Sequence, residues 1–381
     1  MPVTPESPVV LQVLPSLVTG GVERGTIEIA QAIAEADGVS LVASAGGPLA
    51  ASVERVGGRH FTLPLDTKNP IGIWRNAARL EALIKAENVG LVHARSRAPA
   101  WSAWLACQRT GAHFVTTYHG TYAENFPLKR RYNNVMARGE IVIAASRFIA
   151  DLVHEQHGVP AERLRVIPRG VDKAIFDPAI VVVDRLIRLS RTWRLPDGAP
   201  TVVLPGRLTS WKGQSVLLDA IARMERKDVC CVLVGSDQGR SGYSAALMKQ
   251  AVALGIGERV RLVGHCEDMP AAMLLSDVVV HASTRPEAFG RVVIEAQAMA
   301  RPVIAADLGG PVETVAHGVT GWRVPPGDAA ALAAALTEAL SLSQEERHAL
   351  GVRARASVPT VRGMQDATLD VYEAVLSLGD G

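Results

Sequence analysis

The chain has 381 residues, of which 48% are hydrophobic, and this is enough apolar material for two cores, so we expect two domains. The formal net charge is only +2 and aromatic residues make up 4%, which argues against a nucleic-acid partner held by bulk charge or by stacking. The four cysteines show no C-x-x-C spacing and are expected to be buried free thiols. The chain start lacks a charged segment, and no apolar run approaches the roughly 20 residues that span a bilayer. We therefore expect a cytoplasmic protein without a signal peptide.

The first half of the chain alternates short apolar strands with helical stretches. A strand is predicted over residues 9–14, and a helix runs to residue 36 after a loop that contains Gly20 and Gly21. Two glycines let a ligand approach the backbone, and the helix start behind them can receive phosphate. Further strands are expected at 39–43, 89–93 and 113–117, with helices at 73–86 and 98–109. The alternation predicts a parallel sheet, whose ligands bind at the carboxyl ends of its strands.

Several polar residues fall at or shortly after these strand ends. His93 and Arg95 are candidates for acceptor or interdomain contact, with a structural role as the equal alternative. On its own residues, His119 is better explained as a packed or solvated histidine than as a catalytic one. A basic run follows at Lys129, Arg130 and Arg131; such runs are usually solvated helix faces, and the sharper hypothesis is contact with the acceptor or with an anionic membrane.

The second half begins again with a strand and a glycine-flanked loop. A helix is expected at 180–193, and the turn-rich residues 195–200 place the domain change between residues 195 and 196. After a strand at 201–204, Arg207 and Lys212 lie five residues apart on one loop. They can both aim at one anion; the alternative is that they are two exposed bases.

The sequence R-P-E-A-F-G-R-V-V-I-E at 285–295 holds two carboxylates between a predicted strand and a predicted helix. Glu287 is expected on the loop and Glu295 inside the helix, which begins near Gly290. The helix start can bind phosphate, and the two acids can accept hydrogen bonds from sugar hydroxyls and from a ribose. The alternative is a surface helix with solvated acids.

The setting of these two acids resembles the signature of the retaining glycosyltransferases of family 4. The E-x7-E pair is accompanied by Pro286, by the R-P-V-I sequence at 301–304, by the G-G-P sequence at 309–311 and by Glu313. The resemblance covers nearly the whole chain and implies an α/β GT-B fold, in which two Rossmann-like domains face each other across an interdomain cleft. The implied domains are an acceptor-side domain at 1–195, a nucleotide-sugar donor domain at 196–360, and a last helix at 361–381 that packs back on the first.

The same resemblance implies roles for individual residues. Glu287 and His119 would contact the donor sugar, Glu295 the ribose, and Arg207 and Lys212 the donor diphosphate. The remaining donor-binding residues implied by the resemblance are Gly20, Gly21, Phe289, Gly290, Arg291 and Val292.

The implied activity is metal-independent transfer, with retention, of a hexose-type sugar from a nucleoside-diphosphate sugar to an acceptor hydroxyl. The sequence contains no D-x-D pair, so no metal and no cofactor are expected beyond the donor as co-substrate. The expected acceptor is a glycan or a lipid-linked molecule, in lipopolysaccharide or other cell-surface glycan synthesis, with peripheral contact to the inner face of the membrane. Two alternatives stay open: a nucleotide-sugar epimerase of the same fold, and a non-catalytic GT-B binding partner.

Overall fold

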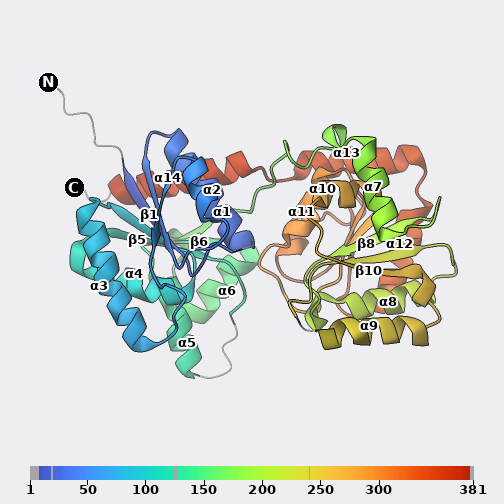
Figure 1. Ribbon diagram of the computed structural model, residues 1–381, viewed down its shortest axis with the longest axis horizontal. Helices are drawn as coiled ribbons and strands as arrows, with labels where there is room; N and C mark the ends of the chain where they lie inside the picture. Colours follow the sequence, from blue (N-terminus) through green and yellow to red (C-terminus); the bar gives the residue numbers. More distant parts are fainter. Residues whose placement is uncertain (1–7, 19, 123–126, 240, 378–381) are drawn as a thin grey trace. The chain divides into compact units, whose positions relative to one another are not determined.

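The structure, a computed structural model, describes residues 8–18, 20–122, 127–239 and 241–377. The chain folds into two units, and each is built on its own parallel sheet (Figure 1). The first unit comprises Met1–Arg169 and Val361–Gly381, and the second comprises Gly170–Thr360. The chain therefore crosses twice between the units.

The first unit contains, in its described residues, seven parallel strands in the order β3-β2-β1-β4-β5-β6-β7. These strands are β1 (Val9–Val13), β2 (Val39–Ser44), β3 (Arg59–Thr62), β4 (Leu91–Ala94), β5 (His113–Tyr118), β6 (Ile141–Ala144) and β7 (Leu164–Val166). Its helices are α1 (Gly21–Glu35), α2 (Ala50–Arg55), α3 (Pro70–Ala86), α4 (Arg97–Thr110), α5 (Pro127–Asn133), α6 (Arg147–His157) and α14 (Val361–Leu376). Figure 1 shows α1 and α14 on one face of the sheet and α3 and α4 on the other. The strand order reverses between β1 and β4, which is where an open α/β sheet leaves a crevice for ligands.

The second unit repeats this plan with six described strands in the order β10-β9-β8-β11-β12-β13. The strands are β8 (Thr201–Pro205), β9 (Cys230–Val234), β10 (Val260–Gly264), β11 (Val278–His281), β12 (Val303–Ala306) and β13 (Trp322–Val324). The helices are α7 (Val183–Trp193), α8 (Gln214–Arg223), α9 (Ser241–Ala253), α10 (Met269–Leu275), α11 (Arg291–Ala298), α12 (Ala329–Ser341) and α13 (Gln344–Ser357). Here the order reverses between β8 and β11.

Alternating residues of the second sheet supply two separate cores. Val202 and Leu204 of β8 pack with the apolar faces of α8 and α12, whereas Val203 between them packs on the opposite face with Trp193 of α7. Because successive strand residues point to opposite faces, a strand that is apolar throughout must be covered on both sides. This explains why the sequence shows short continuous apolar runs rather than alternation.

The last helix, α14, belongs to the first unit. Its stripe of Met364, Val371 and Val375 packs in one core with Ile29 and Ile33 of α1. The amphipathic spacing at the end of the chain is thereby accounted for. All four cysteines are buried and unpaired within the described residues, as predicted.

The division between the units differs from the predicted domain change at 195–196. Residues 170–195 group with the second unit, because α7 packs on α10 and Trp193 packs against the second sheet. An ion pair of 2.6 Å between Arg185 and Asp268 also ties α7 to the start of α10. The turn-rich stretch at 195–200 is therefore a connection inside the second unit, and composition alone did not distinguish it from a linker.

Candidate functional site

Glu287 lies in the loop between β11 and α11, at the carboxyl edge of the second sheet. The backbone N–H of Gly310 donates to the carbonyl of Glu287 over 2.8 Å, and Glu287 also forms a bridge with Gly309. Gly309 has a φ of +70°, and a Cβ there would crowd the backbone of Glu287. The G-G-P sequence at 309–311 thus fixes the loop that presents this carboxylate.

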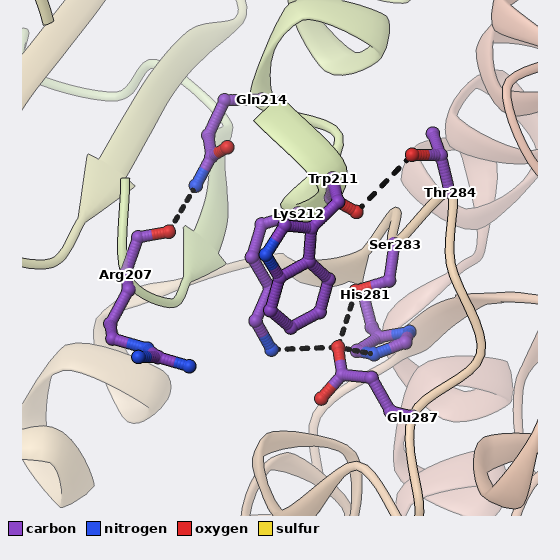
Figure 2. Close-up of polar contacts among 8 residues, drawn as sticks. All are labelled: Arg207, Trp211, Lys212, Gln214, His281, Ser283, Thr284 and Glu287. Carbon is purple, nitrogen blue, oxygen red and sulfur yellow. Dashed lines mark hydrogen bonds and ion pairs between the residues drawn. The ribbon is translucent and has the colours of Figure 1, made fainter. Parts of the chain in front are cut away.

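Three side chains converge on one oxygen of Glu287 (Figure 2). Lys212 Nζ lies 2.6 Å and His281 Nε2 lies 2.8 Å from Oε1, and the Ser283 hydroxyl donates to the same atom. Figure 2 shows the second oxygen, Oε2, pointing away from all three groups. Among the described residues Oε2 has no partner, so it is available to accept a hydrogen bond from a ligand hydroxyl.

The Glu287 carboxylate is held in its charged form. Burial alone would raise its pKa, but the hydrogen bond and charge of His281, together with those of Lys212, offset burial and hold the pKa of Glu287 well below its ordinary value of 4.5. His281 is itself buried, and its Nδ1 has no partner among the described residues. The proton on Nε2 is used in the bond to Glu287.

Lys212 reaches Glu287 because its loop packs closely against the end of β11. Gly213 has a φ of +75°, and a Cβ at this position would overlap the carbonyl oxygen of Ala282. The N–H of Thr284 also donates to the carbonyl of Trp211 over 2.7 Å. Because β8 and β11 are neighbours, the loops that follow them meet at the switch point of the second sheet.

Arg207 begins the same loop directly after β8. Its side chain is exposed, and Gln214 Nε2 donates to its carbonyl over 2.9 Å. Figure 2 shows the side chains of Arg207 and Lys212 extending from the loop toward the same side. The two cations predicted from the sequence therefore lie on one loop, and of the two Lys212 forms part of the Glu287 cluster.

The start of α11 brings together the other donor-binding residues predicted in this unit. The helix begins at Arg291 after Gly290, which has a φ of +79° and a Cβ position only 2.7 Å from Pro311 Cγ. Glu295 lies inside the helix, as predicted, and is 7% exposed, with Arg291 Nε 3.7 Å from its Oε1. Glycine supplies no capping side chain, so the backbone N–H groups of the first turn, which includes Val292, favour an anion here. Phe289, two residues before the helix, is buried.

In the first unit, α1 begins at Gly21 after Gly20, and no side chain caps this helix start within the described residues. Both glycines are exposed at the carboxyl edge of β1, as a phosphate-approaching loop requires. Thr19, in the same loop, lies outside the described residues.

His119 follows β5 and is half-buried, with its Nδ1 against Nη2 of Arg169. Burial and the charges of Arg169 and Arg95 lower the pKa of His119 well below 6.5, so the ring is neutral at physiological pH.

His93 does not fit the predicted contact with an acceptor. It is fully buried, and both ring nitrogens form bonds of 2.6 Å, to the hydroxyls of Tyr372 and Thr117. Arg95 is 2% exposed, and its Nε donates to Gln12 over 2.7 Å. Both residues therefore have structural roles. A residue at the end of a central strand can be buried by neighbouring elements, so its position at a strand end did not by itself indicate contact with a ligand.

The predicted basic run lies on α5. Arg130 and Arg131 line a cavity of about 350 Å³ together with His157, whose Nε2 lies 3.2 Å from the Tyr118 hydroxyl at the end of β5. Lys129 does not line this cavity. Two of the three bases thus lie where an anionic part of a ligand can be bound.

Comparisons with known proteins identify the family of this chain. A model described as glycosyltransferase family 4 matches residues 19–174, and one described as glycosyl transferases group 1 matches residues 188–357. A D-inositol 3-phosphate glycosyltransferase from Jonesia denitrificans is 31% identical over 322 residues, which cover 77% of this chain and 74% of the relative. The chain belongs to glycosyltransferase family 4. It is an enzyme of the glycosyl-transferring class, and this removes the epimerase and the non-catalytic partner as leading interpretations.

Solved structures show the GT-B fold of this glycosyltransferase. A glycosyltransferase from Rickettsia africae is 34% identical, with a TM-score of 0.90 over 97% of this chain and 99% of the other. HepE from Anabaena, solved in complex with UDP and glucose, is 26% identical, with a TM-score of 0.84 over 96% of this chain and 99% of the other. Both units of the chain are matched by these folds.

Sequence reasoning missed three residues of the glycosyltransferase that contact predicted site residues. His281 and Ser283 bind Glu287, and Arg169 binds His119. His281 ends β11, and the same positional rule that selected His93 and His119 would have selected it. No local signal points to Arg169, because its partner lies 50 residues earlier.

The described residues of this glycosyltransferase lack both a metal-binding cluster and a membrane-spanning helix. They contain no group of three or more histidine, cysteine, aspartate or glutamate side chains arranged to hold a metal ion. They also contain no helix that is both long and apolar enough to cross a bilayer.

Proposed function

We propose that this glycosyltransferase moves a hexose-type sugar from a nucleoside-diphosphate sugar to an acceptor hydroxyl, with retention and without a metal ion. The observation that carries the proposal is the Glu287 carboxylate, which is charged, fixed through one oxygen and open at the other. Such a group binds sugar hydroxyls, and the helix start at Arg291 and the Lys212 loop flank it with positive potential.

The proposed reaction breaks the bond between the sugar C1 and the diphosphate oxygen. The electron pair stays on the leaving phosphate, and the acceptor oxygen forms the new bond to C1 on the same face. The acceptor proton passes to the leaving phosphate oxygen. Lys212, Arg207 and the backbone N–H groups at the start of α11 stabilise the charge that develops on that oxygen, each by roughly 3 kcal/mol in a water-excluded site.

Metal independence rests on this set of cations and on the absence of a D-x-D pair from the sequence. Retention rests on membership of the family, whose signature the sequence resembles. Glu287 has the role of a hydroxyl-binding group in this proposal, as the family resemblance implies. Its Oε1 accepts from Lys212, His281 and Ser283, which leaves Oε2 for a sugar hydroxyl.

The donor to test first is UDP-glucose, because HepE was solved with UDP and glucose. For the acceptor, a glycan or lipid-linked hydroxyl in cell-surface glycan synthesis, including lipopolysaccharide, is the first class. A phosphate-bearing polyol is the second, because relatives at 31% identity are named D-inositol 3-phosphate glycosyltransferases and the α5 cavity carries two arginines.

We also propose that the protein is cytoplasmic and that its first unit touches an anionic membrane surface. Ile71 and Trp74, one turn apart on α3, are 62% and 60% exposed, and Leu128 of α5 is 73% exposed. Both helices contact the first turns of α4. The Ser102 hydroxyl donates to the carbonyl of Ile73 in α3, and the Trp101 indole N–H donates to the carbonyl of Tyr132 in α5. We call Ile71 and Trp74 the apolar patch. The exposed bases beside it in the chain are Lys68 and Arg75, and Arg131 is exposed near Leu128 on α5.

The decisive experiment is a thermal-shift panel with UDP-glucose, GDP-mannose and ADP-glucose, with and without EDTA. A ligand that binds only the folded state stabilises it, by about 2.7 kcal/mol at a concentration 100-fold above its Kd. This stabilisation raises the melting temperature. We expect one donor to shift the wild-type protein in EDTA and to shift Lys212→Met much less. If no donor shifts the wild-type protein, or if the shift requires a divalent ion, the proposal is wrong in that part.

A further inference from the structure

Arg169, the last residue of the first unit before the chain crosses to the second, is in contact with two other elements of its own unit. Arg169 is 8% exposed. Its guanidinium Nη2 lies against Nδ1 of His119, after β5, and is 3.4 Å from Nε2 of the same ring, so Nδ1 is the nearer nitrogen. Nη1 of the same group lies against Gly25 in the second turn of α1, where a Cβ would overlap it. One planar group thus fills the space between a helix and a candidate site residue.

We propose that Arg169 is a positioning residue, which fixes the ring of His119 so that Nδ1 accepts a hydrogen bond from the guanidinium and Nε2–H is presented to the donor sugar. This inference rests on the proposed function, in which His119 contacts that sugar. A guanidinium has five N–H donors and no acceptor, so the nitrogen that meets it must be unprotonated. The proton of a neutral ring must then lie on the other nitrogen, and His119 can donate to a sugar oxygen but cannot accept there.

The surroundings of His119 favour the neutral ring that this arrangement needs. The charged or titratable groups that act on it are Arg169, Arg95 and His93, and burial acts in the same direction. Burial and the two arginines also lower the pKa of His93, so that ring adds no charge. Removing Arg169 would leave the ring free to turn and would let the pKa of His119 rise toward its ordinary value.

Gly25 makes the arrangement testable. It is helical and buried, and it has no positive φ, so alanine is compatible with its backbone and is the better helix former. The atom that a Cβ would meet is the far end of a flexible side chain, so Gly25→Ala is expected to displace the Arg169 guanidinium and leave α1 intact. Gly25→Ala and Arg169→Gln should therefore remove the same interaction by different routes.

The experiment compares Arg169→Gln, Gly25→Ala, the double variant and Arg169→Lys, with Gly242→Ala as the control. Gly242 lies in α9 with nothing within 4 Å of its Cβ position, so this change adds a methyl group to a helix and displaces nothing. We expect Arg169→Gln and Gly25→Ala each to lower kcat/KM for the donor by up to about 100-fold, the scale of a misplaced contact group. The double variant should be no worse than Arg169→Gln by more than about twofold, because a shared interaction is lost only once.

Two further readouts separate positioning from a general loss of structure. The acidic limb of the kcat/KM profile should move to higher pH in Arg169→Gln and less in Arg169→Lys, which keeps the charge. Nitrogen-15 NMR of labelled histidine, with His119 assigned by its absence in His119→Ala, should show the Nε2–H tautomer in the wild-type protein and its loss in both Arg169→Gln and Gly25→Ala.

Each possible result decides a separate point. If the effects of Gly25→Ala and Arg169→Gln multiply, or if His119 carries its proton on Nδ1 in the wild-type protein, the positioning role is wrong. If the tautomer changes as expected while His119→Ala keeps wild-type turnover, Arg169 does orient the ring, and it is the proposed sugar contact of His119 that fails.

Discussion

Lys212 Nζ lies 2.6 Å from Oε1 of Glu287, and the two side chains are only 14% and 16% exposed. The residues are 75 positions apart and come from loops after the neighbouring strands β8 and β11. Removing one member of a buried ion pair costs about 3–5 kcal/mol, since the other charge remains uncompensated. The second unit therefore depends on the same contact that presents the Glu287 carboxylate.

Lys212→Met is expected to lower both stability and turnover. His281 and Ser283 still donate to Glu287 in this variant, so we expect the stability loss to be near the low end of that range, about 3 kcal/mol. Turnover should fall by about 100-fold or more, the scale for one lost donor to a developing oxyanion. Steady-state kinetics and thermal unfolding measure the two effects.

Glu287→Gln in the Lys212→Met background separates these effects. With both charges removed, part of the lost stability should return, whereas turnover should stay low because the hydroxyl-binding carboxylate is missing. Near-normal turnover in Lys212→Met and in Glu287→Gln would show that this cluster is not the donor site.

The depressed pKa of Glu287 predicts a specific dependence of stability on pH. An unfolded glutamate takes up its proton near pH 4.5, but the folded protein resists protonation of Glu287 until much lower pH. The stability that this residue contributes is therefore fully present above about pH 4.5 and is lost as the pH falls below that value toward the folded pKa. Other carboxylates titrate alike in the wild-type protein and in Glu287→Gln, so the difference between the two isolates this residue.

We expect the difference in melting temperature between the wild-type protein and Glu287→Gln to be constant from pH 8 to pH 5. Below pH 4.5 the wild-type protein should lose stability relative to the variant. A difference that starts to change above pH 6 would mean that the pKa of Glu287 is raised, and the account of its three partners would be wrong.

Gly213→Ala tests the close approach of the two loops. The added Cβ would overlap the carbonyl oxygen of Ala282, and the φ of +75° costs a non-glycine residue about 1–2 kcal/mol by itself. Gly198 is the matched control, with a φ of +71° and nothing within 4 Å of its Cβ position. Gly198→Ala should show only the backbone cost, whereas Gly213→Ala should also shift Lys212 and reduce turnover. Equal effects in unfolding and kinetic measurements would mean that the contact with Ala282 does not position Lys212.

Much of the second-unit site could be predicted from local sequence. Short runs of β-branched residues followed by glycine and a helical run place Glu287 on a loop and Glu295 in a helix, and the structure confirms both placements. The spacing of Arg207 and Lys212 places them on one loop after β8. These features are local because a strand, a turn and a helix start depend on neighbouring residues.

The features of the structure that the sequence did not indicate depend on contacts between segments far apart in the chain. The approach of Gly213 to Ala282 brings Lys212 to Glu287, and nothing near either residue signals it. The edge strand β3 was missed because Arg59–Thr62 shows no apolar run and takes its conformation from pairing with β2. The boundary at Arg169–Gly170 was missed because the packing of α7, not the composition of the linker, decides where the second unit begins.

Membrane contact through the apolar patch predicts a distinct set of binding results. Trp74 and Ile71 expose most of their surface to water, and each large apolar side chain transferred into a membrane interface contributes about 1.5–3 kcal/mol. Nearby bases add about 1 kcal/mol each on an anionic surface. We expect the wild-type protein to float with liposomes that contain anionic lipid, to bind less as salt rises, and to show a blue-shifted tryptophan emission on binding.

The variant that tests the apolar patch is Ile71→Ser with Trp74→Ser, and the control is Val252→Ser with Val352→Ser. The control residues are 69% and 54% exposed and lie in the second unit, so the control removes exposed apolar side chains without touching the patch. Liposome binding should fall by at least about tenfold in the patch variant, given the transfer energies of two side chains, and should not change in the control. Turnover on a water-soluble acceptor should be the same in both, because neither pair lies in the Glu287 cluster. If the wild-type protein does not bind anionic liposomes even at low salt, or if the control loses as much binding as the patch variant, the first unit has no specific membrane surface and the acceptor must reach the enzyme from solution.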